Sequence, residues 1–246
     1  MPSVRGAIVP HAPVLLPEVS TLPAEETEDL RAAVASLELE TPTVVVISPH
    51  GSTSGVYRTA GGSLNGFGMP GVGVERATDA RLGETLAGSW GRPLLDGGLD
   101  HGVVVPLLCG LATDAFIVGV ALREVTGPGS ASLDEVMQDA SQLGEALRDL
   151  DGGVVVVASV NTAAALTPRA PLTERAGARD VERRLLEALG RELAAVEDIA
   201  YELWLEGGSC APGPLVALAR AVPDARSAPL IYDHPYGVGY LVAELS

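Results

Sequence analysis

The sequence has few of the features that mark nucleic-acid-binding and membrane proteins. It contains no lysine, and its 16 basic residues, all arginines, stand against 32 acidic ones, for a formal net charge of -16. Because nucleic acids and anionic lipid surfaces attract clustered basic side chains, neither is an expected partner. We attribute the acidic excess to solubility rather than to a particular function.

Cysteines and long apolar runs are also scarce. The two cysteines, Cys109 and Cys210, are too few for a disulfide framework in 246 residues, so a reducing cytoplasm is the expected compartment. Prolines and a histidine interrupt the apolar N-terminal stretch, which argues against a secretory signal. The best candidate for a membrane span, Gly102 to Leu122, contains a proline and an aspartate and splits into a helix followed by a strand.

Several nucleotide-binding and hydrolase motifs are missing. No Walker A sequence occurs, and the glycines at 68, 71 and 73 do not form G-x-G-x-x-G after a strand. The stretch "GSTSG" places Thr53, not serine, at the centre of a nucleophile elbow, which disfavours an α/β-hydrolase.

The apolar residues that are present form a clear pattern. Hydrophobic residues make up 47% of the chain, enough for one substantial core. Short runs rich in Val and Ile are typical of buried strands, and helical patterns separate them. We predict strands at Val4–Val9, Thr43–Ser48, Ala115–Ala121, Val154–Ser159 and Val238–Ala243, and helices at Pro23–Leu39, Ser132–Leu150, Glu174–Val196 and Pro212–Ala221. This order predicts an α/β fold for residues 1–246, a three-layer αβα single domain with a central, mostly parallel (mixed) sheet.

Two of the predicted strands end in the same dipeptide. Pro10-His11 follows the first strand, and Pro49-His50 follows the second. Proline fixes the backbone as it leaves the sheet, and ligands of open α/β sheets bind beyond the carboxyl ends of the strands. We therefore expect two imidazoles on neighbouring strand tips to converge on one metal ion. A distance above roughly 6 Å between the two rings would exclude a shared metal ion.

The other histidines lie at further junctions. His101 precedes an apolar helix, and Asp100 before it either orients that ring or caps the helix. His234 is expected in a turn between two C-terminal strands, with a role as an extra ligand as the alternative. Cys109 is expected in the core. The long glycine-rich segment 51–73 is predicted to form a hairpin and an active-site loop, with Tyr57 and Arg58 on the hairpin surface.

The stretches "AIVPHAPVLLPEV", "VVVISPHG" and "DHGVVVPL" together resemble the class III extradiol ring-cleavage dioxygenases and the related Memo-type proteins. That dioxygenase family includes the catalytic B subunit of protocatechuate 4,5-dioxygenase. The resemblance implies that His11 and His50 bind the metal and that His101 acts as an acid/base. It also implies Fe(II) as cofactor, with Zn or Cu as alternatives, and a catecholic aromatic and dioxygen as substrates.

The sequence departs from that family at two places. Where the dioxygenases have a further histidine, "ASVNTAAAL" offers only Ser159, Asn161 and Thr162. The third metal ligand, a glutamate in the dioxygenases, corresponds here to Glu206 or Cys210. We prefer Cys210, because "SCAPGPLVAL" resembles the cysteine setting of Memo-type proteins and a helix N-terminus is expected to lower the thiol pKa.

Three functions remain open from the sequence. The first is a non-heme Fe(II) extradiol dioxygenase-like protein, and the second is a Memo-like metal-binding protein without ring-cleaving activity. The third is a metal-dependent hydrolase on the same scaffold. Abundant Ala, Gly and Val without lysine favour a bacterium of high GC content as the source. A homo-oligomer or a small second subunit is compatible with each function.

Overall fold

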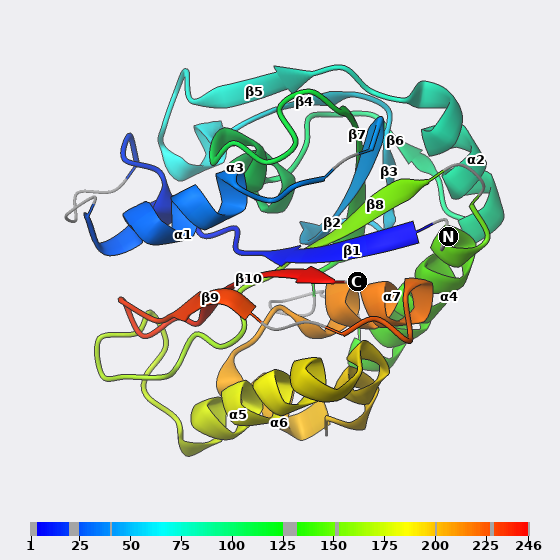
Figure 1. The fold of residues 1–246 in the computed structure, drawn as a ribbon. Coiled ribbons are helices and arrows are strands. Elements are labelled where there is room, and N and C mark those ends of the chain that lie inside the picture. Colours follow the sequence, from blue (N-terminus) through cyan, green and yellow to red (C-terminus); the bar gives the residue numbers. More distant parts are fainter. Residues whose placement is uncertain are drawn as a thin grey trace.

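The computed structural model describes residues 4–19, 25–39, 41–124, 132–150, 153–199, 201–226 and 229–245 (Figure 1). Its strands are β1 (Val4–Val9), β2 (Thr43–Gly51), β3 (Gly55–Tyr57), β4 (Ala60–Ser63), β5 (Gly73–Arg76), β6 (Leu94–Leu95), β7 (Phe116–Arg123), β8 (Val154–Ser159), β9 (Pro229–Asp233) and β10 (Tyr240–Leu245). Its helices are α1 (Glu25–Ala35), α2 (Ala80–Trp90), α3 (His101–Leu108), α4 (Leu133–Arg148), α5 (Ala176–Arg191), α6 (Tyr201–Gly207) and α7 (Pro212–Ala221). Short 3-10 helices are η1 (Pro13–Leu15), η2 (Asn65–Phe67) and η3 (Leu193–Asp198).

One mixed sheet organises the molecule, with the strand order β6-β3-β7-β2-β8-β1-β10-β9. The four central strands β7, β2, β8 and β1 run parallel to one another. Antiparallel pairs join β3 to β7, β10 to β1 and β9 to β10. The predicted α/β fold with a mostly parallel central sheet is therefore confirmed.

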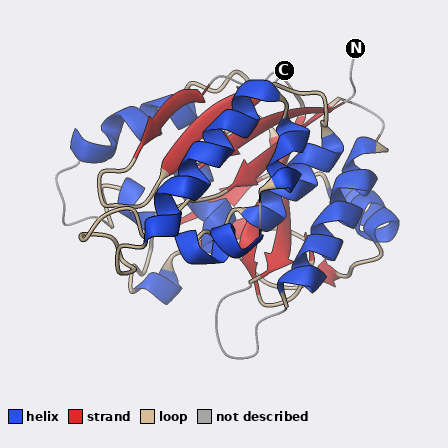
Figure 2. Ribbon diagram, turned by 90° about the horizontal axis from the view of Figure 1, so that it is seen from below, coloured by secondary structure: helices blue, strands red, loops and turns tan. Residues whose placement is uncertain are grey.

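Helices cover both faces of this sheet. In Figure 1, α2, α4, α5, α6 and α7 lie on one side, whereas α1, α3 and the β4–β5 hairpin lie on the other. Figure 2 looks onto the side of α5 and α6, where helices lie in front of the strands. Every residue of β8 is buried, as expected for a strand covered on both faces. Two apolar clusters, one on each face, form the core.

Most predicted elements are present, with shifted ends. The first and fourth predicted strands match β1 and β8, whereas the last one, Val238–Ala243, is found two residues later as β10. The helix predicted over Glu174–Val196 breaks after Arg191 and continues as the 3-10 helix η3. Ser132, the first residue of the helix predicted over Ser132–Leu150, is the N-cap of α4 and forms a capping box with Glu135. In the helix predicted over Pro23–Leu39, positions 23 and 24 lie outside the described residues.

The glycine-rich segment forms several short elements. It contains β3, β4 and η2 and reaches β5, which pairs with β4 in an antiparallel hairpin. Helices α2 and α6 were not predicted, and β9 was expected only as a strand of unstated bounds before the turn at His234. Within the described ranges, no helix combines the length and the apolar character needed to cross a lipid bilayer.

Candidate metal centre

His11 leaves the sheet directly after β1. Pro10 has no backbone N–H to donate to a neighbouring strand, and β1 ends at the residue before it. The backbone N–H of His11 donates to Oδ1 of Asn161, 3.3 Å away, just beyond the end of β8. His11 is almost completely buried, with 1% of its surface exposed. The hydrogen bond thus fixes the backbone of His11 beside the end of β8, and the ring is buried.

His50 lies at an irregularity near the end of β2. The pairing of β2 with β7 shifts register between Ser48 and Gly51, and Pro49 and His50 lie inside that shift. Such bulges redirect side chains and occur often beside active sites. The backbone N–H of His50 donates to Oγ of Ser48 at 3.2 Å. Nδ1 of the His50 ring lies 3.4 Å from a carboxylate oxygen of Glu124, the residue after β7.

His101 is the first residue of α3, and Asp100 before it is the N-cap. The Asp100 carboxylate accepts hydrogen bonds from the backbone N–H of Gly102 at 2.8 Å, from Ser48 at 2.6 Å and from Tyr57 at 2.8 Å. Asp100 therefore caps the helix and ties β2, β3 and α3 together. In the described part of the chain its carboxylate makes no hydrogen bond to the His101 ring, so the role in orienting that ring remains a prediction.

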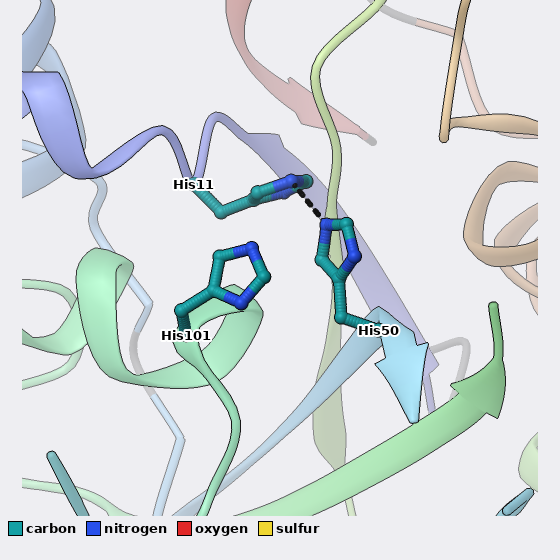
Figure 3. A group of neighbouring side chains, drawn as sticks. All are labelled: His11, His50 and His101. Carbon is teal, nitrogen blue, oxygen red and sulfur yellow. Dashed lines mark hydrogen bonds between the residues drawn. The ribbon is translucent and has the colours of Figure 1, made fainter. Parts of the chain in front are cut away.

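The three histidines converge at the carboxyl end of the sheet (Figure 3). The Nε2 atoms of His11 and His50 are 2.9 Å apart, and one nitrogen from each of the three rings lies within 4.8 Å of the others. The His50 and His101 ring centroids are 4.1 Å apart. The expectation of neighbouring strands was wrong, because β8 lies between β1 and β2. The rings reach across the end of β8 to meet.

Cys210 reaches this cluster, whereas Glu206 does not contact it. The Cys210 sulfur lies 3.6 Å from Nε2 of His11 and 3.6 Å from the backbone carbonyl oxygen of Asn161. Glu206 instead packs on Gly177 near the start of α5. Of the two residues considered for a third ligand, the structure places Cys210 beside the histidines.

Burial sets the protonation of these groups. It lowers the pKa of His11 well below the usual value, and the neighbouring imidazoles of His50 and His101 lower this pKa further. Burial also lowers the pKa of His50, although the charge of Asp100 opposes this shift. It lowers the pKa of His101 to about 4. Neutral imidazoles have a free nitrogen lone pair, so the cluster is ready to bind a cation without first losing protons.

The thiol of Cys210 differs from its prediction. Burial raises its pKa to about 11, the opposite of the lowering expected at a helix N-terminus. Desolvation disfavours the thiolate and outweighs the backbone hydrogen bonds that favour it. A bound cation reverses this balance, because coordination to a metal deprotonates a thiol.

The remaining predicted residues are distributed as follows. His234 is exposed in the turn between β9 and β10, as expected, and the buried Cys109 belongs to the core, where burial raises the pKa of its thiol to about 12. Tyr57 is buried beneath the site, with 9% of its surface exposed, so its placement on the hairpin surface was wrong. Arg58 is exposed and pairs with Asp96.

Replacing Tyr57 by phenylalanine is expected to lower the free energy of unfolding by about 1–2 kcal/mol. The change removes one hydrogen bond to the Asp100 carboxylate and keeps the ring that fills the space around Gly119. Urea unfolding followed by circular dichroism measures the difference. An unchanged midpoint and slope of the unfolding curve would show that loss of the Tyr57 hydroxyl has no cost in stability and would contradict the prediction.

Sequence reasoning missed two residues at the site, Glu124 and Phe67. Glu124 lies next to the His50 ring, and Phe67 on η2 contacts the His101 ring. The only available signal for Glu124 was its position three residues after the strand predicted over Ala115–Ala121. Phe67 lies in the segment predicted as an active-site loop, but no pattern singled it out.

Comparisons with known proteins support the fold but give no function. No family model matches the chain, and no curated protein matches it. A crystal structure of the uncharacterized protein JW3007 from Escherichia coli K12 is similar, with a TM-score of 0.64 and 15% sequence identity over 98% of this chain and 99% of that chain. At this identity the likeness shows a shared fold over nearly the whole length of both chains.

Proposed function

We propose that this protein is a non-heme Fe(II)-dependent extradiol dioxygenase-like enzyme that opens the ring of a catecholic aromatic with dioxygen. The observation that carries the proposal is the convergence of His11, His50 and His101 at the carboxyl end of the sheet. These are the residues on which the resemblance places two metal ligands and an acid/base group. The site thus combines donors for a cation with a third imidazole beside them.

The donor set fits a divalent metal ion. Two ligand nitrogens that are each about 2.1 Å from one cation and at right angles to each other are about 3 Å apart. The Nε2 atoms of His11 and His50 are 2.9 Å apart, and Nδ1 of His50 faces a Glu124 oxygen at 3.4 Å. A carboxylate on the far nitrogen of a metal-binding histidine is a common outer partner, because it fixes the tautomer and orients the ring.

Each residue has a distinct part in the proposed reaction. His11 and His50 would hold Fe(II), which would supply Lewis-acid and redox chemistry toward a catechol and dioxygen. His101 takes a proton from a catechol hydroxyl and returns it later in the reaction, a task that suits a neutral imidazole. Asp100 holds the helix end that carries His101, and Asn161 holds the backbone of His11.

An anaerobic reconstitution tests this proposal. Metal-free protein is loaded with Fe(II), mixed with a panel of catechols and exposed to oxygen, and the yellow ring-opened product is followed by absorbance. We expect product from at least one catechol, with oxygen consumed in equal amount. Loading with Zn(II) is the control, because Zn(II) has no redox chemistry and gives no product. Tight Fe(II) binding without consumption of any catechol would contradict the proposal.

Cys210 favours a second candidate, a Memo-like metal-binding protein without ring-cleaving activity. Its sulfur lies 3.6 Å from Nε2 of His11, where the dioxygenase pattern has a carboxylate. A thiolate makes the site softer and favours copper or zinc over iron. Metal analysis of freshly purified protein separates the candidates: iron supports the dioxygenase, whereas copper or zinc that Cys210→Ser removes supports the second.

The proposed location of the protein is the cytoplasm of a bacterium. Both cysteines are free thiols, which suits a reducing compartment. The substrate is proposed to be a small aromatic molecule. Whether copies of the chain associate, or a small second subunit completes the site, is decided by the mass of the purified assembly in solution.

A further inference from the structure

Phe67 is an exposed aromatic side chain that lies against the candidate site. Half of its surface, 50%, is exposed, and its ring meets the ring of His101 edge-on, with centroids 4.8 Å apart and an interplanar angle of 62°. His101 in turn lies 4.1 Å from His50, measured between ring centroids. The His101 ring therefore contacts both metal-binding candidates on one side and a phenyl ring that is half in solvent on the other.

The backbone around Phe67 holds this ring in place while leaving space beside it. Leu64, the residue before η2, is fully buried and its N–H donates to the carbonyl of Val72, which anchors the turn to the β4–β5 hairpin. Phe67 itself donates its N–H to the carbonyl of Leu64. Gly66 and Gly68 flank it, and a Cβ added to either would have no atom within 4 Å. The ring is anchored at its base and open at its sides.

An exposed phenyl ring is unfavourable in water, and half of the Phe67 side chain lies in solvent next to the His101 ring. A flat apolar molecule bound at the histidines would cover the exposed half. Aromatic rings attract one another edge-to-face or in offset stacks, and a saturated molecule of the same size lacks this contribution. Phe67 therefore offers a contact that distinguishes planar aromatic ligands from other chelators.

We propose that Phe67 forms one wall of the substrate site and selects planar aromatic ligands by ring contact. This inference rests on the proposed function, since it takes the three histidines as the place where the ligand binds. It names a specificity-determining residue: Phe67 contributes to binding of the ring and takes no part in proton transfer.

Ligand binding to Zn(II)-loaded protein tests the inference without turnover. The probes are 4-nitrocatechol, a coloured aromatic chelator, and acetohydroxamate, which chelates through two oxygens but has no ring. We expect Phe67→Ala and Phe67→Leu to weaken 4-nitrocatechol binding by about 3- to 10-fold. Acetohydroxamate should bind as tightly as to the wild type, and Phe67→Tyr should restore 4-nitrocatechol binding. In steady state the same loss should appear in KM, with kcat unchanged within twofold.

Phe116 provides the matched control. It is similarly exposed, at 47%, but begins β7, at the end of the strand away from Glu124, so Phe116→Leu should bind both probes normally. Unchanged 4-nitrocatechol binding in Phe67→Ala, or equal loss of both probes, overturns the inference. If 4-nitrocatechol binds through Phe67 but no catechol is ever cleaved, the dioxygenase proposal fails and the aromatic wall stands. If the wild type binds neither probe, both fail.

Discussion

Replacing His50 by alanine is expected to abolish stable binding of Fe(II) or Zn(II), with an affinity loss above 100-fold. Removing the outer hydrogen-bonding partner of a ligand costs roughly 10- to 100-fold, and removing the ligand itself costs more. Nε2 of His50 is 2.9 Å from Nε2 of His11, so its loss leaves the remaining imidazole without its partner. Isothermal titration with Zn(II), and metal analysis after dialysis, measure the change. His50 is only partly buried, so the variant should keep its fold, which circular dichroism checks.

Two further variants make this result specific. His234→Ala removes an exposed histidine in the β9–β10 turn and should bind metal as the wild type does. Glu124→Gln keeps the shape of the side chain beside Nδ1 of His50 but removes its charge, and its affinity should fall between those of the wild type and His50→Ala. If His50→Ala and His11→Ala both bind as tightly as His234→Ala, the histidine cluster is not a metal site.

The sequence predicted those features of the fold and site that depend on a single short segment. The Val-rich run of β8 has a single polar residue, Ser159 at its end, so burial on both faces was predictable. A proline precedes His11 directly after β1 and precedes His50 at the register shift near the end of β2. Since the carboxyl ends of parallel strands share one edge of the sheet, the meeting of these two rings followed from the pattern.

Pairings between distant segments could not be predicted in this way. The position of β8 between β1 and β2 is a matter of which strands pair in the sheet. The apolar pattern of each strand does not reveal its pairing partners. Glu124 meets His50 because β7 pairs with β2, and Tyr57 is buried because β3 pairs with β7. The pKa of Cys210 is raised because the folded chain buries it, whereas the sequence showed only the helix that follows.

Replacing His101 by glutamine is expected to lower the rate of ring cleavage by about 100- to 10,000-fold, the usual contribution of a general acid or base. Glutamine retains a polar side chain at the start of α3 but has no nitrogen lone pair that can accept a proton. If His11 and His50 hold the metal, Zn(II) affinity should stay within a few-fold of the wild type. Titration with Zn(II) and single-turnover kinetics of the Fe(II) form with the best catechol measure the two quantities.

Zn(II) affinity and the rate of ring cleavage together show whether His101 is an acid/base group or a metal ligand. A metal affinity as low as that of His50→Ala would make His101 a third ligand, which its place within 4.8 Å of the other two nitrogens allows, and would contradict the acid/base role. Asp100→Asn is the companion variant, because asparagine is also a good N-cap and keeps the start of α3. If Asp100 is only structural, this variant loses stability through weaker hydrogen bonds from Ser48 and Tyr57 but keeps its rate within a few-fold. A rate as low as that of His101→Gln would instead show that the Asp100 charge acts on the neighbouring imidazole during proton transfer.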